Sequence, residues 1–256
     1  METEAILTLL QEVADEVINP RFRSLTAEQV GEKKPGDLVT VADREAELLI
    51  TQALSAAYPD AMVLGEEAYA QDPDLMDRYL AAHHAFTVDP VDGTKNFVAG
   101  SKDHAVMVAE VFDGAPSRAW IWQPQHATAY VAEHGAGAWR NGERLVRPAP
   151  SPVPAEWRGV TSRRSWLGLD LGDLRPLELT WVCCGVDYPK LVEGFADFVV
   201  YAHALPWDHA PGSLLLSESG GYAGPLTGGG TVAAADRTTY DAVLARLSSR
   251  GLEGRA

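Results

Sequence analysis

The chain has 256 residues, of which 46% are hydrophobic and 22% are charged, an ordinary globular composition that argues against disorder. Asp and Glu total 36 against 21 Lys and Arg, which gives a formal net charge of −15. A protein that coats nucleic acid or binds anionic membranes would carry the opposite charge, so neither partner is expected.

Helical and short apolar segments alternate in the first third of the chain. Apolar side chains recur at helical spacing over residues 5–18 and predict an amphipathic helix that ends near Asn19-Pro20. We then expect a polar loop over 31–37, a helix over 40–58 stopped by Pro59, a strand over 61–65, a helix over 72–82 and a strand over 86–89.

From residue 105 the pattern changes to short β-rich runs separated by turn signals. The runs lie at 106–112, 119–122 and 127–133, with Asp113-Gly114 and Gln123-Pro124-Gln125 between them. This pattern predicts an antiparallel meander. The glycines at 135 and 137 indicate a hairpin, and Asn141-Gly142 marks another tight turn.

Four prolines between residues 148 and 154 are the best candidate for a boundary within the chain. We therefore expect lobes over 1–147 and 148–256 that together form one continuous fold. In the second lobe we expect strands near 158–161, 179–183 and 198–201, and helices over 187–194, 210–219 and 240–248.

The only cysteines, Cys183 and Cys184, are adjacent. Neighbouring cysteines rarely form an unstrained disulfide, and two cannot complete a zinc site. The first four residues are acidic where a signal peptide would be basic, and no apolar run approaches the roughly 18 residues that a membrane span needs. We expect reduced thiols, small buried side chains at both positions, and a cytoplasmic protein.

The strongest local signal runs from Val88 to Phe97, with the sequence Val-Asp-Pro-Val-Asp-Gly-Thr-Lys-Asn-Phe. Pro90 disfavours helix at Asp89 and fixes its own φ, so the chain is expected to turn there. Asp89 and Asp92 can then face one point, and the residues after Gly93 can open a helix whose free N–H groups suit phosphate. A plain strand-to-helix turn with an Asp cap explains the same residues.

Three other acidic positions adjoin expected strands or helices. Glu66-Glu67 follow the strand at 61–65, Asp43 follows Thr40, and Asp208 stands in Trp207-Asp208-His209. Each has an ordinary explanation: a solvated Glu pair, a capping box with Thr40, and a helix N-cap.

Sites in α/β proteins assemble at strand ends, so Glu66, Asp89, Asp92 and Asp208 could converge. Two charges about 4 Å apart repel by roughly 4 kcal/mol at an effective dielectric near 20, so converging carboxylates would need cations. Oxygen ligands without a cysteine or histidine cage favour magnesium, manganese or calcium over zinc. Such ions leave room for substrate phosphate and would draw an anionic substrate to an acidic protein.

These segments resemble the inositol monophosphatase family of magnesium-dependent, lithium-sensitive phosphatases. The match comprises residues 37–43, 65–67, 89–97, 207–212 and 218–221, in family order across nearly the whole chain. The resemblance implies an α+β or α/β fold, a layered αβαβα sandwich that is usually a homodimer. It also implies that a metal-activated water attacks the phosphorus of a small phosphorylated metabolite directly.

The resemblance also implies a role for each matching residue. The metal ligands would be Glu66, Asp89, the carbonyl of Val91, Asp92 and Asp208, holding two or three Mg²⁺ (or Mn²⁺) ions, the third near Glu66 and Asp43. The catalytic residues would be Thr94, which orients the water, its partner Asp43, and Glu67. The substrate-binding residues would be Gly93, Thr94, Lys95, Cys184, Tyr201 and Asp208.

Two departures leave the substrate open. Inositol-selective members usually carry an acid a few residues before Trp-Asp, whereas Tyr201 occupies about that position here. Lys95 replaces a small polar residue, and the Thr-Lys pair is similar to that in members that act on other phosphates. Inositol phosphate, histidinol phosphate, a sugar bisphosphate and 3′-phosphoadenylate all remain candidates, as does a non-catalytic member that binds phosphate ligands or proteins.

Other reaction classes lack their motifs. The sequence has neither the Gly-x-Ser-x-Gly elbow of serine hydrolases nor a P-loop. His104, His203 and His209 are alternative general acids, although histidines more often serve as surface or core residues.

Overall fold

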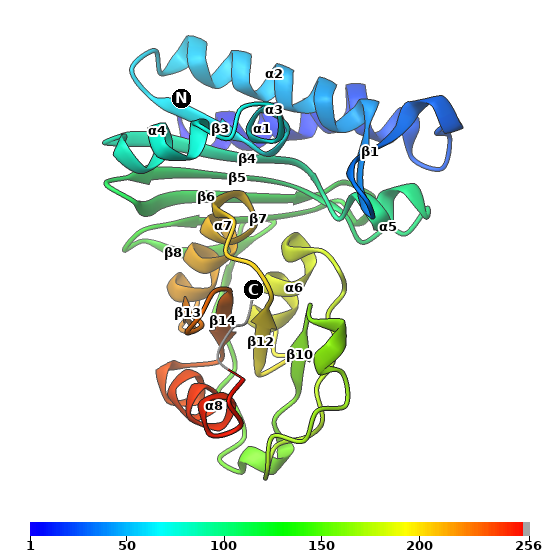
Figure 1. The fold of residues 1–256 in the computed structure, drawn as a ribbon. Helices are drawn as coiled ribbons and strands as arrows, with labels where there is room; N and C mark the ends of the chain where they lie inside the picture. The colour runs from blue at the N-terminus through cyan, green and yellow to red at the C-terminus, as the bar shows by residue number, and fades with distance from the viewer. Residues whose placement is uncertain (253–256) are drawn as a thin grey trace.

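Five layers of alternating helices and sheets make up the protein in the computed structural model, which describes residues 1–252 (Figure 1). Two helices cover a seven-stranded sheet, two more lie between that sheet and a five-stranded sheet, and a last helix covers the far face. The expected αβαβα sandwich is therefore confirmed.

The large sheet has the strand order β3-β4-β5-β6-β7-β8-β9, with β3 and β4 parallel and every other pair antiparallel. Its strands are β3 (Met62–Gly65), β4 (His84–Asp92), β5 (Ala105–Phe112), β6 (Ala115–Gln123), β7 (Thr128–Glu133), β8 (Gly137–Arg140) and β9 (Glu143–Leu145). The expected meander is confirmed. Asp113 and Asn141 take φ near +48° in its two-residue turns, each followed by a glycine with positive φ, as the twist of a tight hairpin requires.

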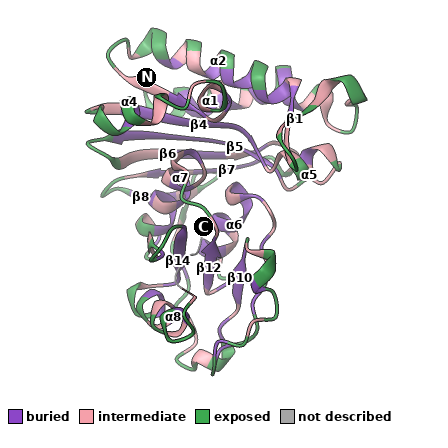
Figure 2. Cartoon of the chain, in the orientation of Figure 1, coloured by how far each residue is buried: buried purple, intermediate pink, exposed green. Residues whose placement is uncertain are grey.

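The central strands β4 and β5 of this sheet are buried on both faces (Figure 2), and side chains along each strand alternate between the faces. On β5, Val106 and Val108 pack under helix α1 (Thr3–Val13) and helix α2 (Val41–Ala57), while Met107 faces the middle layer. A π-helical turn, Ala14–Ile18, extends α1 to the end predicted for it. Burial on two faces explains why β5 is almost continuously apolar.

The middle layer consists of α6 (Cys184–Val192) and α7 (Pro206–Glu218). Below it, the strand order is β11 (Glu178–Leu179), β10 (Gly159–Thr161), β12 (Phe198–Tyr201), β14 (Thr231–Ala234) and β13 (Tyr222–Pro225). Helix α8 (Arg237–Ser249) packs Val243 and Leu247 against the outer face of this sheet.

Several boundaries differ from the expected ones. The loop expected over 31–37 is wrong, because β1 (Val30–Lys34) and β2 (Asp37–Thr40) form an antiparallel hairpin there. The strand expected over 179–183 ends at Leu179, and helices α6 and α7 begin three or four residues earlier than expected. The remaining short elements are α3 (Glu66–Gln71), which the sequence reading missed, α4 (Leu75–Ala81), α5 (Thr94–Val98), and the 3₁₀ turns Asn19–Arg21, Ala27–Gln29, Pro124–His126, Pro154–Glu156 and Arg164–Trp166.

Among residues 1–252, no helix combines the length and the apolar character that crossing a bilayer requires.

Candidate metal centre

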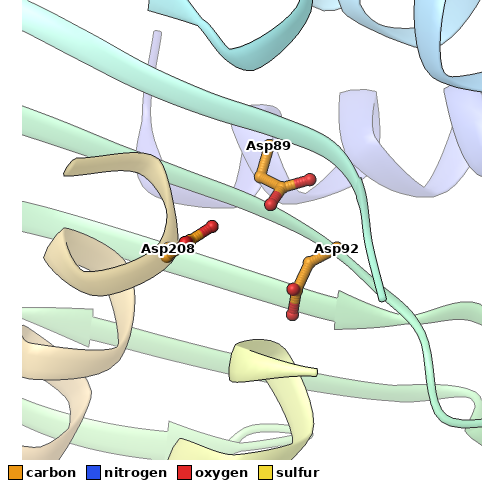
Figure 3. A group of neighbouring side chains, drawn as sticks. All are labelled: Asp89, Asp92 and Asp208. Atoms are coloured by element: carbon orange, nitrogen blue, oxygen red, sulfur yellow. The ribbon is translucent and has the colours of Figure 1, made fainter. Parts of the chain in front are cut away.

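Three aspartates from two distant segments meet at one point (Figure 3). Asp89, Asp92 and Asp208 each offer a carboxylate oxygen, and these oxygens all lie within 4.8 Å of one another. Asp89 and Asp92 come from β4, whereas Asp208 comes from the first turn of α7. The structure therefore brings together three of the four carboxylates that the sequence analysis expected to converge.

A bulge in β4 explains how two aspartates three residues apart share a face. In a regular strand, residues i and i+3 point to opposite faces. The pairing of β4 with β5 shifts register between Asp89 and Asp92, and Pro90, which has no N–H to donate, lies within the shift. The turn expected at Pro90 is thus wrong in form, because the strand continues through a bulge to Asp92.

Asp208 reaches the site because α7 is anchored beside it. Trp207, the preceding residue, is buried with Leu64 of β3 and Ala85 of β4. Asp208 is the third residue of α7, inside the first turn, so it is not the N-cap that one reading of the sequence allowed.

The carboxylates of the cluster repel one another. Burial, and then the charges of neighbouring carboxylates, raise the pKa values of Asp89 and Asp208 well above their ordinary range. The Oδ1 atom of Asp89 is buried with no hydrogen-bond partner among residues 1–252. An unpartnered carboxylate oxygen among like charges, with oxygen donors only, fits a hard divalent cation.

Asp92 is held rigidly by the start of α6. Its Oδ2 accepts hydrogen bonds from the amide of Gly185 and from the thiol of Cys183, whose Sγ lies 2.9 Å away. Burial raises the pKa of Asp92 to about 6, and these hydrogen bonds limit the rise. The sequence analysis expects only a small buried side chain at Cys183 and does not predict this contact. Its only signal was a Cys-Cys-Gly run just before a helix.

Thr94 and Asp43 form a second polar unit beside the aspartates. The Oγ1 of Thr94 lies 3.1 Å from Oδ1 of Asp43 and 3.1 Å from the carbonyl oxygen of Val91. Asp43 also accepts from the backbone N–H of Thr40 at 2.8 Å, so the capping box proposed for α2 is present as well. Burial raises the pKa of Asp43 to about 7. Gly93 enters α5 with φ of +81°, a conformation suited to glycine.

Glu66 and Glu67 begin α3, and their partners are residues that the sequence reading did not single out. The Nζ of Lys33 lies 2.6 Å from Glu66 and 2.8 Å from Glu67. The carboxylate of Glu47 on α2 accepts the free amides of Glu67 and Ala68 at 2.7 and 2.8 Å. Glu66 is not among the three carboxylates that lie within 4.8 Å of one another.

A cavity of about 170 Å³ opens beside the aspartates. Its lining includes Asp92, Cys184, Tyr201 and Asp208. Tyr201 is 2% exposed, and its hydroxyl has no hydrogen-bond partner in the part of the chain that the structure describes. Lys95 is exposed on α5 and does not line this cavity.

The three candidate histidines differ in position: His104 and His209 are buried, whereas His203 is exposed and lines the cavity. His104 is buried outside the site, between Phe22 and Phe97. His209 lines the cavity, but both ring nitrogens are engaged, with Tyr188 at 3.0 Å and the carbonyl of His203 at 2.8 Å. Burial lowers the pKa of His209 to about 4, so its ring is neutral at pH 7.

Comparison of the sequence with known proteins gives one consistent result. The profile of the inositol monophosphatase family matches residues 2–252. An inositol-1-monophosphatase of Rhizobium meliloti is 34% identical over 220 residues, which cover 79% of this chain and 77% of that protein. The Nus factor SuhB of Pseudomonas aeruginosa is 29% identical over 235 residues, 84% of this chain and 82% of that protein.

Solved structures agree on the fold. An IMPase of Thermotoga maritima superimposes with a TM-score of 0.79 at 23% identity, covering 98% of both chains. A staphylococcal IMPase complexed with products gives 0.81 at 23% identity, over 97% of this chain and 95% of that one. An IMPase/NADP phosphatase complexed with NADP and Ca²⁺ gives 0.81 at 22% identity with the same coverage.

Proposed function

The chain belongs to the inositol monophosphatase family, and on that premise we propose that it hydrolyses a small phosphate monoester with the help of divalent cations. The observation that carries the proposal is the meeting of Asp89, Asp92 and Asp208 within 4.8 Å. Thr94 and Asp43 lie beside them. The hydroxyl of Thr94 contacts both Asp43 and the carbonyl oxygen of Val91, which lies between Asp89 and Asp92 in β4.

The three aspartates would hold the cations, together with Glu66 and the carbonyl of Val91. Two or three Mg²⁺ ions are proposed, with Mn²⁺ as a substitute, because every donor is a hard oxygen. The Ca²⁺ bound by one structural relative supports a hard divalent ion. Bound there, such ions would supply positive charge to the phosphoryl and leaving oxygens and lower the pKa of water.

Thr94 and Asp43 provide a path for a proton. Thr94 donates its hydroxyl hydrogen toward Asp43, which leaves the lone pairs of Oγ1 available to accept a hydrogen from water. A water held against Thr94 can attack phosphorus while its proton moves to Oγ1 and the Thr94 proton moves to Asp43. The ester P–O bond breaks as the new O–P bond forms, and the leaving oxygen takes a proton from solvent water to give the free alcohol. Asp43 must be ionised for this step, and its pKa of about 7 is close to the value that suits a general base at neutral pH. Glu67 is proposed as the third catalytic residue.

The phosphate would lie against the amides of Gly93 and Thr94, and the leaving group would enter the cavity lined by Cys184 and Tyr201. The cavity of about 170 Å³ is close to the roughly 150 Å³ that encloses benzene. This size supports a leaving group of about one ring, such as inositol or histidinol. A sugar bisphosphate or 3′-phosphoadenylate would have to extend further, for example into the adjoining cavity that shares His203. Lys95 is proposed as an outer contact.

The proposal is tested by phosphate release from a panel of monoesters, with Mg²⁺ and with a chelator. Release that requires Mg²⁺ and is lost in Asp92→Asn, with the fold retained by circular dichroism, is expected. A folded wild type that binds Mn²⁺ yet releases no phosphate from any monoester would contradict it. That result would favour a binding role instead, of the kind that relatives named Nus factors suggest.

Family membership also supports features that concern the whole protein. We propose a cytoplasmic homodimer that is inhibited by lithium, with the proline-rich segment 148–154 as the boundary between the two lobes. Sedimentation tests the dimer, and Li⁺ titration of Mg²⁺-dependent phosphate release tests the inhibition.

A further inference from the structure

The side-chain amide of Asn96 connects two segments that meet at the candidate metal centre. Asn96 is the third residue of α5, which begins at Thr94. Its Nδ2 lies 2.8 Å from the carbonyl oxygen of Asp103, just before β5, and 2.9 Å from the carbonyl oxygen of Trp181, 85 positions along the chain. Because an amide NH₂ group has two hydrogens, it can donate one to each carbonyl. Asn96 thus ties α5 both to the loop before β5 and to the turn before α6.

The turn before α6 is strained. Val182 has a φ of +60°, a left-handed conformation that is unfavourable for a β-branched side chain. Residues in such conformations persist only where their surroundings hold them, and they cluster at active sites. Val182 donates its amide hydrogen to Oγ1 of Thr180 at 3.1 Å. Trp181 donates its own to Oδ1 of the buried Asp187 at 2.8 Å. Two side chains therefore hold the amides of this turn, and Asn96 holds its carbonyl side.

The turn places the first residues of α6 against a proposed metal ligand. Cys183 follows Val182 directly, and its thiol donates to Oδ2 of Asp92 at 2.9 Å. The amide of Gly185 donates to the same oxygen. A change in the turn would move both donors together, and Asp92 would lose the orientation in which it meets the other two aspartates.

The same contacts enclose the glycine proposed to bind phosphate. An added Cβ at Gly93 would lie 3.0 Å from the Cβ of Cys183 and 3.1 Å from the carbonyl oxygen of Asp103. Asn96 donates to that same carbonyl and to the turn that precedes Cys183. Its amide therefore fixes the two backbone segments that pack on Gly93.

We propose that Asn96 is a positioning residue: its amide holds Val182 in the strained conformation, and the turn so formed orients Asp92 toward the cations. The inference rests on the metal-dependent function proposed above. Without the amide, the carbonyl of Trp181 loses its donor and Val182 can relax to a negative φ. The first turn of α6 would then move away from Asp92.

The test measures Mn²⁺ affinity by isothermal titration calorimetry. Asn96→Asp keeps the shape of the side chain but has no N–H to donate. We expect its Mn²⁺ affinity to be weaker by about 10-fold, the lower end of what loss of an outer partner of a metal ligand costs. Glycine adopts a positive φ without strain, so Asn96→Asp should weaken the affinity less in a Val182→Gly background than in the wild type. Ala127→Gly is the matched control, because Ala127 is another non-glycine residue with positive φ, of +46°, and the full loss is expected in that background.

Hydrogen exchange of the metal-free proteins, followed by mass spectrometry, tests the turn without cations. The amides of residues 181–187 are expected to exchange faster in Asn96→Asp than in the wild type. If Asn96→Asp does not fold, Asn96→Ala replaces it, since it removes the donors without adding a charge.

Three outcomes overturn the inference: unchanged affinity in the folded Asn96 variant, an equal loss in the wild-type and Val182→Gly backgrounds, or unchanged exchange over residues 181–187. An equal recovery in the Ala127→Gly background would also overturn it, because the effect would then reflect general stability. Failure of the proposed function is distinct, since it would appear as a wild type that binds no Mn²⁺. The exchange rates would still decide whether Asn96 holds the turn.

Discussion

The hydroxyl of Thr94 lies 3.1 Å from Oδ1 of Asp43, although the two residues are 51 positions apart. Asp43 uses its other oxygen, Oδ2, to cap helix α2 through the N–H of Thr40. One buried carboxylate therefore fixes the start of a helix and orients a hydroxyl at the candidate site. Because the cap and the hydroxyl use different oxygens, Thr94 can be changed without removing the cap.

Thr94→Ala is expected to reduce kcat by about 10²–10⁴-fold, the usual contribution of a positioned proton-transfer group. The capping box remains, so the fold and the Mn²⁺ affinity should stay close to those of the wild type. Thr94→Ser keeps the hydroxyl and should keep most of the activity. Steady-state phosphate release gives kcat, and calorimetry gives the affinity. If kcat falls equally in Thr94→Ala and Thr94→Ser, the hydroxyl of Thr94 does not take part in proton transfer.

The stability of the metal-free protein should fall as the pH rises toward 8. Burial raises the pKa of Asp43 and of Glu47 to about 7, whereas an unfolded Asp or Glu titrates near about 4. Each of these carboxyl groups has a higher pKa in the folded protein than in the unfolded chain. Its contribution to stability is therefore fully present below the pKa of the unfolded chain and is lost as the pH rises through the pKa of the folded protein. Divalent cations should reverse the loss, because they favour the ionised carboxylates.

Asp43→Asn isolates this effect, since an amide does not titrate. In a chelator, the melting temperature of the wild type minus that of Asp43→Asn should decrease between about pH 5 and pH 8. A change of several degrees is expected, because 1 kcal/mol shifts the melting temperature of a domain of this size by about 2–4 °C. A difference that stays constant or increases over this range would mean that Asp43 is not held protonated by burial.

Cys183→Ala should weaken cation binding without touching a ligand atom. The thiol donates to Oδ2 of Asp92, and loss of a hydrogen bond that orients a metal ligand typically costs about 10–100-fold in affinity. Cys183→Ser restores a donor and should recover part of the loss. Cys184→Ala is the control, because both cysteines line the substrate cavity but the thiol that donates to Asp92 is that of Cys183; Cys184→Ala should therefore affect KM rather than Mn²⁺ affinity. An unchanged Mn²⁺ affinity in Cys183→Ala would show that the thiol of Cys183 does not orient Asp92 for cation binding.

The parts of the site that could be predicted from sequence are those encoded locally. The helix expected over 40–58 is present as α2, and it buries Ala46, Ile50 and Leu54, four residues apart, where it meets the sheet. The run from Asp89 to Thr94 indicates paired carboxylates followed by a helix start, and both are present. In α2 and in residues 89–94, the local structure is determined by residues that are neighbours in the sequence.

Contacts between distant segments could not be predicted in the same way. Cys183 and Asp92 are 91 positions apart, and no periodicity relates them. The β1–β2 hairpin was missed because its polar residues show no alternation, and all residues of β1 are half-buried or exposed. Lys33 therefore reads as part of a solvated loop, and only the fold places its ammonium beside Glu66 and Glu67.

Gly65→Ala should disturb the start of α3. A Cβ at this position would lie 2.3 Å from the carboxyl carbon of Glu47, which caps that helix. The clash is expected to cost about 1–3 kcal/mol, as overpacking does, and to move the helix that carries Glu66. Urea unfolding measures the loss. Gly36→Ala is a useful comparison. Its φ of +78° would strain an alanine, but an added Cβ would have no atom of residues 1–252 within 4 Å apart from its chain neighbours. A loss of stability there should leave cation affinity unchanged.

Tyr201 offers the clearest test of substrate choice. Its hydroxyl has no hydrogen-bond partner among residues 1–252, so Tyr201→Phe removes no internal hydrogen bond there and should not lower the free energy of unfolding by the amount that losing a buried hydrogen bond costs. Its ring stacks on Tyr188 with centroids 5.4 Å apart, and phenylalanine preserves that stacking. A rise in KM for one monoester would therefore report a hydrogen bond between the hydroxyl and that leaving group.

The same position should distinguish polyol from less hydroxylated substrates. Tyr201→Glu introduces an acceptor for ring hydroxyls, and is expected to raise kcat/KM for inositol phosphate relative to histidinol phosphate by about 10-fold, the effect of one good hydrogen bond of about 1.4 kcal/mol. Tyr201→Gln separates charge from hydrogen bonding. If neither variant changes the ratio of the two kcat/KM values, and Tyr201→Phe keeps the wild-type KM for every monoester, the leaving group does not reach Tyr201 and selectivity must arise elsewhere in the cavity.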